Sequence, residues 1–351
     1  MNISNLTGEK ILLLGGAGFI GHNLALELVS RGAEVTIVDG FSVNSIINLT
    51  IDTDEEKDIL LYRSFLEERI KLLKKAGVNL IPLDVSNRYQ LAKILDFDYS
   101  VVYLLAAVAH ASRADSSPVG AIENSLVPFI NTITELSERP EVRLVFLSSS
   151  TVYGNFEKET VDESDICKPF GMYAVMKHVS EQLLTSTAEK TNLNFCAVRP
   201  SALYGERCIS RRVSQIFLEN AFSGRKLLFK GQPDERLDFT YIKDLVSGLV
   251  LAGFNEKAKG EIFNITYGDA QPVLKLIDIL KEFFPDLTLE IQPRNQATPV
   301  RGTLSNQKAK KILGFNPEWH LDEGYRNYIN WYLSRSKNER MVLNSISQAN
   351  E

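Results

Sequence analysis

The sequence has few features that would tie it to a membrane, an oxidising compartment or a metal. Its three cysteines, Cys167, Cys196 and Cys208, are odd in number and widely spaced, which gives neither a disulfide framework nor a zinc pattern. No apolar run approaches the roughly 20 residues that span a bilayer. The opening segment "MNISNLTGEK" lacks the basic and apolar regions of a signal peptide. We therefore expect a cytoplasmic protein without a bound metal.

Positive charge is also in short supply. The chain has 39 lysines and arginines against 44 acidic residues, for a net charge of -5, so bulk electrostatics give no reason to expect nucleic acid as a partner. Hydrophobic residues make up 44% of the 351 residues, enough for a substantial core. These totals predict a globular protein with one large domain or two joined ones.

The first 198 residues alternate short apolar runs with helical patterns. Continuous apolar strands with helices between them are typical of a parallel sheet that is covered on both faces. This pattern predicts an α/β fold. Strands are expected at 10–14, 35–38, 79–82, 101–105, 143–148 and 194–198, and helices near 120–138 and 171–190.

The remaining segments follow other patterns. The connection at 41–78 is unusually long and contains an amphipathic helix, which we expect to pack on the domain edge, with a role in substrate access or dimerisation as the alternative. Its apolar stripe is Ile59, Tyr62, Leu66, Ile70 and Leu73. Past residue 200 the pattern is mixed and predicts a smaller subdomain with helices at 211–223, 243–254, 272–284 and 321–334. A polar, frayed tail is expected over 336–351.

A glycine-rich turn follows the first strand. Gly15, Gly18 and Gly21 stand between a strand and a helix in "GGAGFIG". Glycines there allow a pyrophosphate to approach the backbone at the positive end of the helix. Asp39 ends the next strand, where an acid accepts hydrogen bonds from ribose hydroxyls and favours NAD over NADP. The pattern predicts a dinucleotide site, with a ligand-free turn as the alternative.

Other residues are expected along the same cofactor. Asp84 ends a strand where a carboxylate can meet the adenine amino group, and Ala106 and Ala107 are small enough to let the cofactor lie close to the backbone. Taken alone, either segment would more often be plain core. The expected cofactor-binding set is Gly15, Gly18, Phe19, Ile20, Gly21, Asp39, Asp84, Val85, Ala106, Ala107, Tyr173, Lys177 and Pro200.

Tyr173 and Lys177 form Y-x-x-x-K on a predicted helix, one turn apart, so both side chains face the same way. A phenol ionises at about pH 10, but a neighbouring ammonium and the positive nicotinamide ring favour the phenolate. Ser149, at the end of a strand, can hydrogen-bond the reacting oxygen. Alone, Y-x-x-x-K is most often a surface pair. After a dinucleotide turn it predicts that Ser149, Tyr173 and Lys177 are catalytic.

At this point the chain resembles a known family. The motifs "GGAGFIG", "LLAAVAH", "SSSTVYG" and "YAVMK" are similar, in order and spacing, to those of extended short-chain dehydrogenase/reductases that act on nucleotide sugars. The resemblance covers roughly residues 9–335. It implies a Rossmann domain, a doubly wound parallel sheet, at 1–198 and a smaller mixed α/β substrate domain at 199–335, with some segments returning to the first. It also implies a tightly retained NAD and a homodimer formed through a helix pair.

The residues before Tyr153 indicate which reaction of the family to expect. By resemblance, 4,6-dehydratases carry Thr-Asp-Glu before Val-Tyr-Gly, and decarboxylases of UDP-glucuronate carry a Glu there. This chain has Ser149, Ser150 and Thr151. The absence of acids favours a 4-epimerase acting on a UDP-sugar, in which hydride leaves C4, a 4-keto sugar forms and hydride returns to the opposite face.

Two alternatives stay open. The first is a dehydratase, reductase or decarboxylase of the same family whose acids lie elsewhere in the chain. The second is a non-catalytic NAD-binding sensor or scaffold.

The resemblance also implies contacts to the sugar and the diphosphate. Arg236 stands one place earlier than the family pattern has it, and Ser201 stands where an Asn is usual. Arginine can bind phosphate bidentately, whereas a solvated surface charge is the alternative for each arginine. The expected substrate contacts are Ser149, Ser150, His110, Ser201, Arg236 and Arg301.

Overall fold

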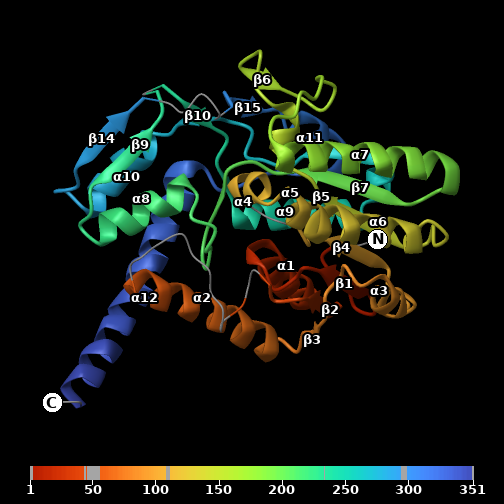
Figure 1. The fold of residues 1–351 in the computed structure, drawn as a ribbon, viewed down its shortest axis with the longest axis horizontal. Coiled ribbons are helices and arrows are strands. Elements are labelled where there is room, and N and C mark those ends of the chain that lie inside the picture. The colour runs from red at the N-terminus through yellow and green to blue at the C-terminus, as the bar shows by residue number, and fades with distance from the viewer. Residues whose placement is uncertain are drawn as a thin grey trace.

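A seven-stranded parallel sheet forms the centre of the computed structural model, which describes residues 3–42, 45, 56–107, 111–232, 234–293 and 299–349 (Figure 1). The strand order is β12-β7-β5-β4-β1-β2-β3. The order reverses between β1 and β4, and in such sheets ligands bind beyond the carboxyl ends of the strands at this point. The predicted α/β Rossmann fold is confirmed. The strands are β1 (Lys10–Leu14), β2 (Glu34–Asp39), β3 (Asn79–Pro82), β4 (Val101–Leu104), β5 (Arg143–Leu147), β7 (Phe195–Arg199) and β12 (Glu261–Asn264).

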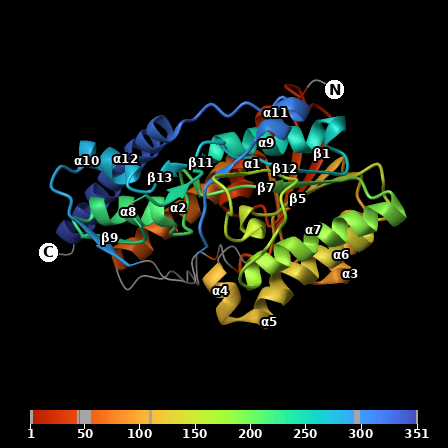
Figure 2. The same cartoon turned by 90° about the horizontal axis from the view of Figure 1, so that it is seen from above.

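Helices cover both faces of this sheet (Figure 2). On one face lie α3 (Arg88–Leu95), α6 (Val127–Leu136) and α7 (Met172–Thr191), and on the other lie α1 (Phe19–Ser30) and α9 (Ile242–Phe254). Successive residues of β1 point to opposite cores, since Ile11 and Leu13 belong to one apolar cluster and Leu12 and Leu14 to the other. Burial on both faces explains why the strands are continuous apolar runs.

A smaller mixed α/β part follows β7. Short strands pair there as β8 (Leu203–Tyr204) with β11 (Thr240–Tyr241), β9 (Leu227–Lys230) with β14 (Leu289–Gln292), and β10 (Arg236–Leu237) with β13 (Gln271–Pro272). The helices α8 (Val213–Phe222), α10 (Lys275–Phe283) and α12 (Leu321–Ala349) complete it. Because α9 and β12 return to the parallel sheet, the boundary at 198/199 stays a prediction. The remaining elements include β6 (Thr160–Val161), which pairs with β15 (Thr303–Leu304), and the helices α4 (Ala111–Ser116), η3 (Glu256–Ala258) and α11 (Gln307–Leu313).

The helix α2 (Glu56–Lys75) connects the two parts of the molecule. Tyr62 Oη accepts a hydrogen bond from Gln215 Nε2 of α8 at 2.9 Å, and the Phe65 ring centroid lies 5.0 Å from that of Trp331 on α12. The helix therefore packs against the C-terminal part and does more than cover the domain edge. The predicted stripe is only partly correct: Tyr62, Leu66 and Leu73 are buried, Ile59 and Ile70 are half-buried, and Leu61, Phe65 and Arg69 are also buried.

The helix α12 is longer than the sequence pattern indicated. It continues to Ala349, so the expectation of a frayed tail from residue 336 is wrong. After Gly324 no glycine or proline occurs before Ala349, and nothing in that stretch stops a helix. In Figure 1 its blue C-terminal end extends away from the rest of the molecule. No described helix, α12 included, is long and apolar enough to cross a membrane.

Replacing Phe65 with alanine should destabilise the protein through loss of the α2–α12 contact. Phe65 is 1% exposed, and truncating a buried aromatic ring costs about 3–5 kcal/mol. Urea unfolding followed by circular dichroism measures the change. The control is Lys71→Ala on the exposed side of α2, which should shift the unfolding free energy by less than about 0.5 kcal/mol. Equal effects of the two substitutions would contradict this account of α2.

Candidate functional site

The glycine turn connects the end of β1 to the start of α1 and lies against the end of β4. A Cβ on Gly15 would lie 2.6 Å from Ala106 Cα, and one on Gly21 would lie 2.5 Å from Gly16 Cα, so neither position accepts a side chain. Gly18 is the N-cap of α1 and makes no side-chain cap hydrogen bond. The first amides of α1 are therefore without a side-chain cap, as a helix end that binds a phosphate requires. The turn fits the pyrophosphate of a dinucleotide.

Asp39 lies beside this turn at the end of β2. Its Oδ2 accepts from the Ala17 amide at 2.9 Å and its Oδ1 from the Phe41 amide at 2.8 Å, which holds the carboxylate next to the phosphate turn. This is where an acid can meet the ribose of a dinucleotide. Asp84, the residue predicted to meet the adenine, is exposed, and its Oδ1 accepts from the Ser86 amide at 2.9 Å.

The other predicted cofactor residues lie at the same edge of the sheet or near it. Phe19 and Ile20 begin α1 and are half-buried, as are Ala106 and Ala107 after β4, whereas Val85 is buried. Pro200 follows β7, and its carbonyl accepts from the Ser150 amide at 3.0 Å. Their contacts to a cofactor stay predictions.

Tyr173 and Lys177 face together on the first turns of α7. Lys177 Nζ donates to the Leu147 carbonyl at 2.6 Å and lies 5.9 Å from the centre of the Tyr173 ring. The ammonium is buried and lies 4.8 Å from the centre of the Phe146 ring. Burial lowers the pKa of Lys177 to about 8, although the Glu181 carboxylate acts to raise it. A positive charge therefore lies beside the Tyr173 phenol near neutral pH.

Ser149 lies two residues after the carbonyl that Lys177 binds. It is buried and caps the short helix η2 (Ser150–Tyr153), with its Oγ accepting from the Thr151 amide at 3.2 Å. Since η2 packs against α7, the structure brings Ser149, Tyr173 and Lys177 to one strand end. Their chemical roles stay predictions.

A small cavity lies between the end of β4 and α7. It places Ala106, from the predicted cofactor path, together with Tyr173 and Lys177. Ser125, which was not predicted from the sequence, also lines this cavity. The lining residues are Ala106, Ser125, Phe146, Tyr173, Met176, Lys177 and Ser180.

Ser125 reaches the cavity from η1 (Ile122–Leu126), a π-helical turn between α5 (Pro118–Ala121) and α6. Pro128 has no N–H to donate to the Asn124 carbonyl, which disfavours the regular α-helical pattern here. Turns of this type are frequent at functional sites. The proline within the expected helix at 120–138 was the available sequence signal.

A buried ion pair lies behind the site. Arg199 Nη2 is 2.6 Å from Glu181 Oε2, and the two side chains are 4% and 3% exposed. Arg199 also donates from Nη1 to Tyr153 Oη at 2.8 Å. Burial raises the pKa of the Tyr153 phenol, which keeps it neutral. No short-range pattern in the sequence indicated this pair, whose members are 18 residues apart.

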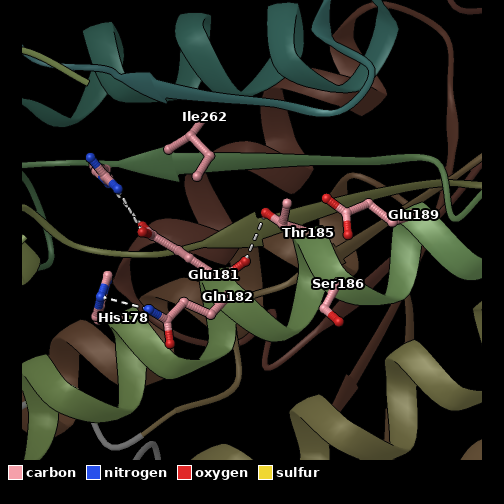
Figure 3. A pocket seen from close by; sticks show the side chains of 8 residues that line it. His178, Glu181, Gln182, Thr185, Ser186, Glu189 and Ile262 are labelled. Atoms are coloured by element: carbon pink, nitrogen blue, oxygen red, sulfur yellow. Dashed lines mark hydrogen bonds and ion pairs between the residues drawn. The ribbon is translucent and has the colours of Figure 1, made fainter. Parts of the chain in front are cut away.

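One group near this pair has donor types that can bind zinc. Atoms of Cys167, His178 and Glu181 lie within 4.8 Å of one another, beside an open depression of about 340 Å³. Figure 3 shows Glu181 turned toward the strands and His178 beside Gln182. However, Arg199 donates to both Cys167 Sγ, at 3.5 Å, and Glu181. A guanidinium cation thus takes the place that a metal ion would need, and the absence of a metal stays a prediction.

The predicted substrate residues lie in different parts of the molecule. Arg301 lies at the same strand end as Ser149, because its Nη1 donates to the carbonyls of Ser150 and Gly154 at 3.1 and 3.3 Å. Arg236, on β10, donates to the Ala270 carbonyl, and Ser201 is buried after Pro200. His110 lies outside the described residues. The contacts of these residues with a substrate remain predictions.

The phosphate turn at β1 and the Tyr173–Lys177 helix meet at one edge of the sheet, which is the arrangement of a dinucleotide-dependent short-chain dehydrogenase/reductase. The chain belongs to the NAD-dependent epimerase/dehydratase family, whose model matches residues 11–266. That match runs from β1 through the glycine turn, the Ser149 strand end and the Tyr173–Lys177 helix to the residues just after β12.

Individual relatives share about a quarter of their residues with this chain. UDP-glucuronate 4-epimerase 5 of Arabidopsis thaliana is 27% identical over 93% of this chain and 76% of its own length. A putative UDP-glucose 4-epimerase of Methanocaldococcus jannaschii is 25% identical over 93% of this chain and 99% of its own length.

Solved structures share the fold. UDP-glucose 4-epimerase of Thermotoga maritima has a TM-score of 0.80 at 23% identity and covers 93% of this chain and 99% of its own. UDP-glucuronic acid 4-epimerase of Bacillus cereus, in complex with UDP-glucuronic acid and NAD, has a TM-score of 0.80 at 22% identity and covers 92% of this chain and 98% of its own.

Changing Gly15 to alanine should weaken NAD binding more than tenfold, because the new methyl group would displace the turn from Ala106. The matched control is Gly224→Ala. Gly15 and Gly224 both have positive φ, +79° and +66°, but no atom lies within 4 Å of a Cβ at Gly224. Calorimetric titration of cofactor-stripped protein with NAD measures both variants. Equal NAD affinity in the two variants would contradict the placement of the pyrophosphate at this turn.

Proposed function

We propose that the protein is an NAD-dependent nucleotide-sugar 4-epimerase that acts on a UDP-sugar. The observation that carries this proposal is the composition of the β5 strand end. Ser149, Ser150 and Thr151 supply hydroxyl groups next to Tyr173 and Lys177, and none of the three supplies a carboxylate. Removing water from C5 and C6 needs an acid and a base there, whereas inverting C4 does not. The UDP-sugar 4-epimerases among the relatives support the same reaction.

The residues of the site have separate roles in this proposal. Bound NAD supplies the acceptor and donor of the C4 hydride. Tyr173 takes the proton of the C4 hydroxyl and later returns it, and the Lys177 ammonium stabilises the phenolate in between. The amide of Thr151 donates to Ser149 Oγ, so the Ser149 hydroxyl hydrogen can point at the C4 oxygen and steady it as a ketone forms.

We assign the binding of the substrate diphosphate to arginine side chains. Arg301 already lies at the Ser149 strand end, which places its guanidinium group close to the reacting sugar. Arg236 is farther along the chain on β10 and is the second candidate. Guanidinium groups suit this role because they can donate two parallel hydrogen bonds to phosphate oxygens.

The proposal is tested by a panel of nucleotide sugars without added cofactor. Purified protein is incubated with UDP-glucose, UDP-glucuronate, UDP-N-acetylglucosamine and the matching dTDP-, GDP- and CDP-glucose, and products are followed by NMR. The expected product is the 4-epimer of one or more UDP-sugars without net oxidation or reduction. A 4-keto, 6-deoxy or pentose product would contradict the epimerase, and inactivity toward the whole panel would favour the non-catalytic alternative.

Changing Tyr173 to phenylalanine should lower kcat by about 10²–10⁴-fold, because the proton of the C4 hydroxyl loses its acceptor. The circular dichroism spectrum and the NAD content should stay those of the unaltered protein. The control is Tyr89→Phe, since Tyr89 is 71% exposed on α3 and should leave kcat unchanged. Full turnover by Tyr173→Phe would show that the role given to Tyr173 is wrong.

We also propose that the protein is a homodimer. Neighbouring helices on one face of the sheet, α5, η1, α6 and α7, expose apolar side chains: Val119 at 68%, Ile122 at 39%, Ile130 at 43% and Val175 at 40%. Apolar residues grouped in this way suit an interface between subunits. Light scattering after size exclusion should give twice the 39.4 kDa of one chain. The double variant Val119→Glu, Val175→Glu should give the single mass, and a monomeric unaltered protein would contradict the proposal.

A cytoplasmic location is the remaining part of the proposal. Cys167, Cys196 and Cys208 are all free thiols, two of them buried, as expected in a reducing compartment. Fractionation of cells that express the full chain tests this location.

A further inference from the structure

The helix α7 holds two successive residues of the β5 strand end. Lys177 Nζ donates to the Leu147 carbonyl at 2.6 Å, and one turn farther along α7 the Glu181 Oε1 accepts from Ser148 Oγ at 2.5 Å. The next residue of the strand is Ser149. Tyr173, Lys177 and Glu181 are spaced by four residues on one side of this helix. The contacts made by α7 thus determine where Ser149 lies relative to Tyr173.

Glu181 is itself held from the opposite side. Arg199 of β7 donates to Oε1 from Nε at 2.9 Å and to Oε2 from Nη2 at 2.6 Å, a bidentate contact that fixes the plane of the carboxylate. Both side chains are almost fully buried. Figure 3 shows Glu181 reaching from α7 toward the strands. A carboxylate fixed in this way cannot turn to release Ser148 without breaking the ion pair.

We propose that Glu181 is a positioning residue of the reaction, which holds Ser148 while it pairs with Arg199 and thereby fixes Ser149 against the Tyr173–Lys177 side of α7. This inference rests on the proposed epimerase function. Glu181 touches neither the sugar nor the cofactor in this assignment. Its hydrogen bond with Ser148 positions the next residue, Ser149, which binds the reacting oxygen. Its negative charge acts separately, on the pKa of Lys177.

The charge of Glu181 affects a measurable property, the pKa of Lys177, which a purely structural role of Glu181 would not change. Glu181 is the charge that acts to raise the pKa of Lys177 against the lowering by burial. Removing the charge of Glu181 should lower the pKa of Lys177. Lys177 would then lose its proton at a lower pH, and Tyr173 would lose its supporting positive charge at the same pH. The other charged or titratable groups around Lys177 and Glu181 include Tyr173 and His178 on α7, Arg199 on β7, Tyr153 on η2, and Glu163 and Cys167 in the loop before α7.

The first test compares two single variants that separate charge from position. Glu181→Gln keeps an acceptor for Ser148 but removes the charge, so the alkaline limb of kcat/KM should move down by about one pH unit. Ser148→Ala keeps the charge but removes the hydrogen bond, so kcat should fall about tenfold, with KM and the alkaline limb unchanged. A merely structural role would lower thermal stability in both variants and change neither the limb nor kcat.

A second variant keeps the test decisive if Glu181→Gln does not fold. Glu181→Gln leaves the buried Arg199 guanidinium without its carboxylate, which is strongly destabilising. The double variant Glu181→Gln, Arg199→Gln removes both charges and should show the same downward shift of the limb. An unchanged limb in either folded variant, or full kcat in Ser148→Ala, would overturn the assignment of Glu181.

A readout without turnover separates this inference from the proposed function. The pH dependence of Lys177 acylation by acetic anhydride, followed by peptide mass spectrometry, reports its deprotonation directly. The midpoint should lie near pH 8 in the unaltered protein and lower in the Glu181→Gln variants. If the unaltered protein turns over no nucleotide sugar, the epimerase proposal fails. The acylation midpoint still decides whether Glu181 controls Lys177, and equal midpoints would refute that control.

Discussion

The central sheet is buried on both faces, and this constraint determines where polar chemistry can occur in the molecule. A strand between two apolar cores cannot carry unpaired polar side chains along its length. Polar groups therefore gather where the strands end, and the carboxyl ends of parallel strands share one edge. Gly15, Asp39, Ala106 and Ser149 follow or end β1, β2, β4 and β5 at that edge. The glycine turn and the residues that we propose to be catalytic are neighbours for this reason.

The contact between α7 and β5 fixes the positions of the residues at this edge more closely. Lys177 serves two purposes, since it binds the Leu147 carbonyl and lies beside the Tyr173 ring. Its burial makes the charged form less stable, and a negative neighbour opposes this effect. Glu181 supplies that charge, and Arg199 in turn compensates Glu181. A buried ion pair is an uncertain source of stability, and here it holds the carboxylate that accepts from Ser148 at the β5 strand end.

Much of the site could be predicted because its motifs are short. Two of the six predicted strands, at 10–14 and 79–82, coincide with β1 and β3, and the ends of the other four lie within one residue of the observed ends. Y-x-x-x-K forms one turn of helix as expected. Other features could not be found in this way. Ser125 lines the cavity from the π-helical η1, which interrupts the helix expected there, and Ser148, Glu181 and Arg199 are separated by 33 and 18 residues. Arg301 reaches the Ser150 carbonyl from 151 residues away.

The sequence by itself determined the alternation of strands and helices, the phosphate turn, the Tyr173–Lys177 pair and the lack of carboxylates before Tyr153. These are local properties, set by periodicity, by glycine at positions without room for a side chain, and by the spacing of one helical turn. Only the tertiary structure decided that α2 contacts α12, that Arg199 occupies the space between Cys167 and Glu181, and that α7 holds residues 147 and 148. Such contacts depend on how distant segments pack, and the periodicity of a single segment carries no information about its partners.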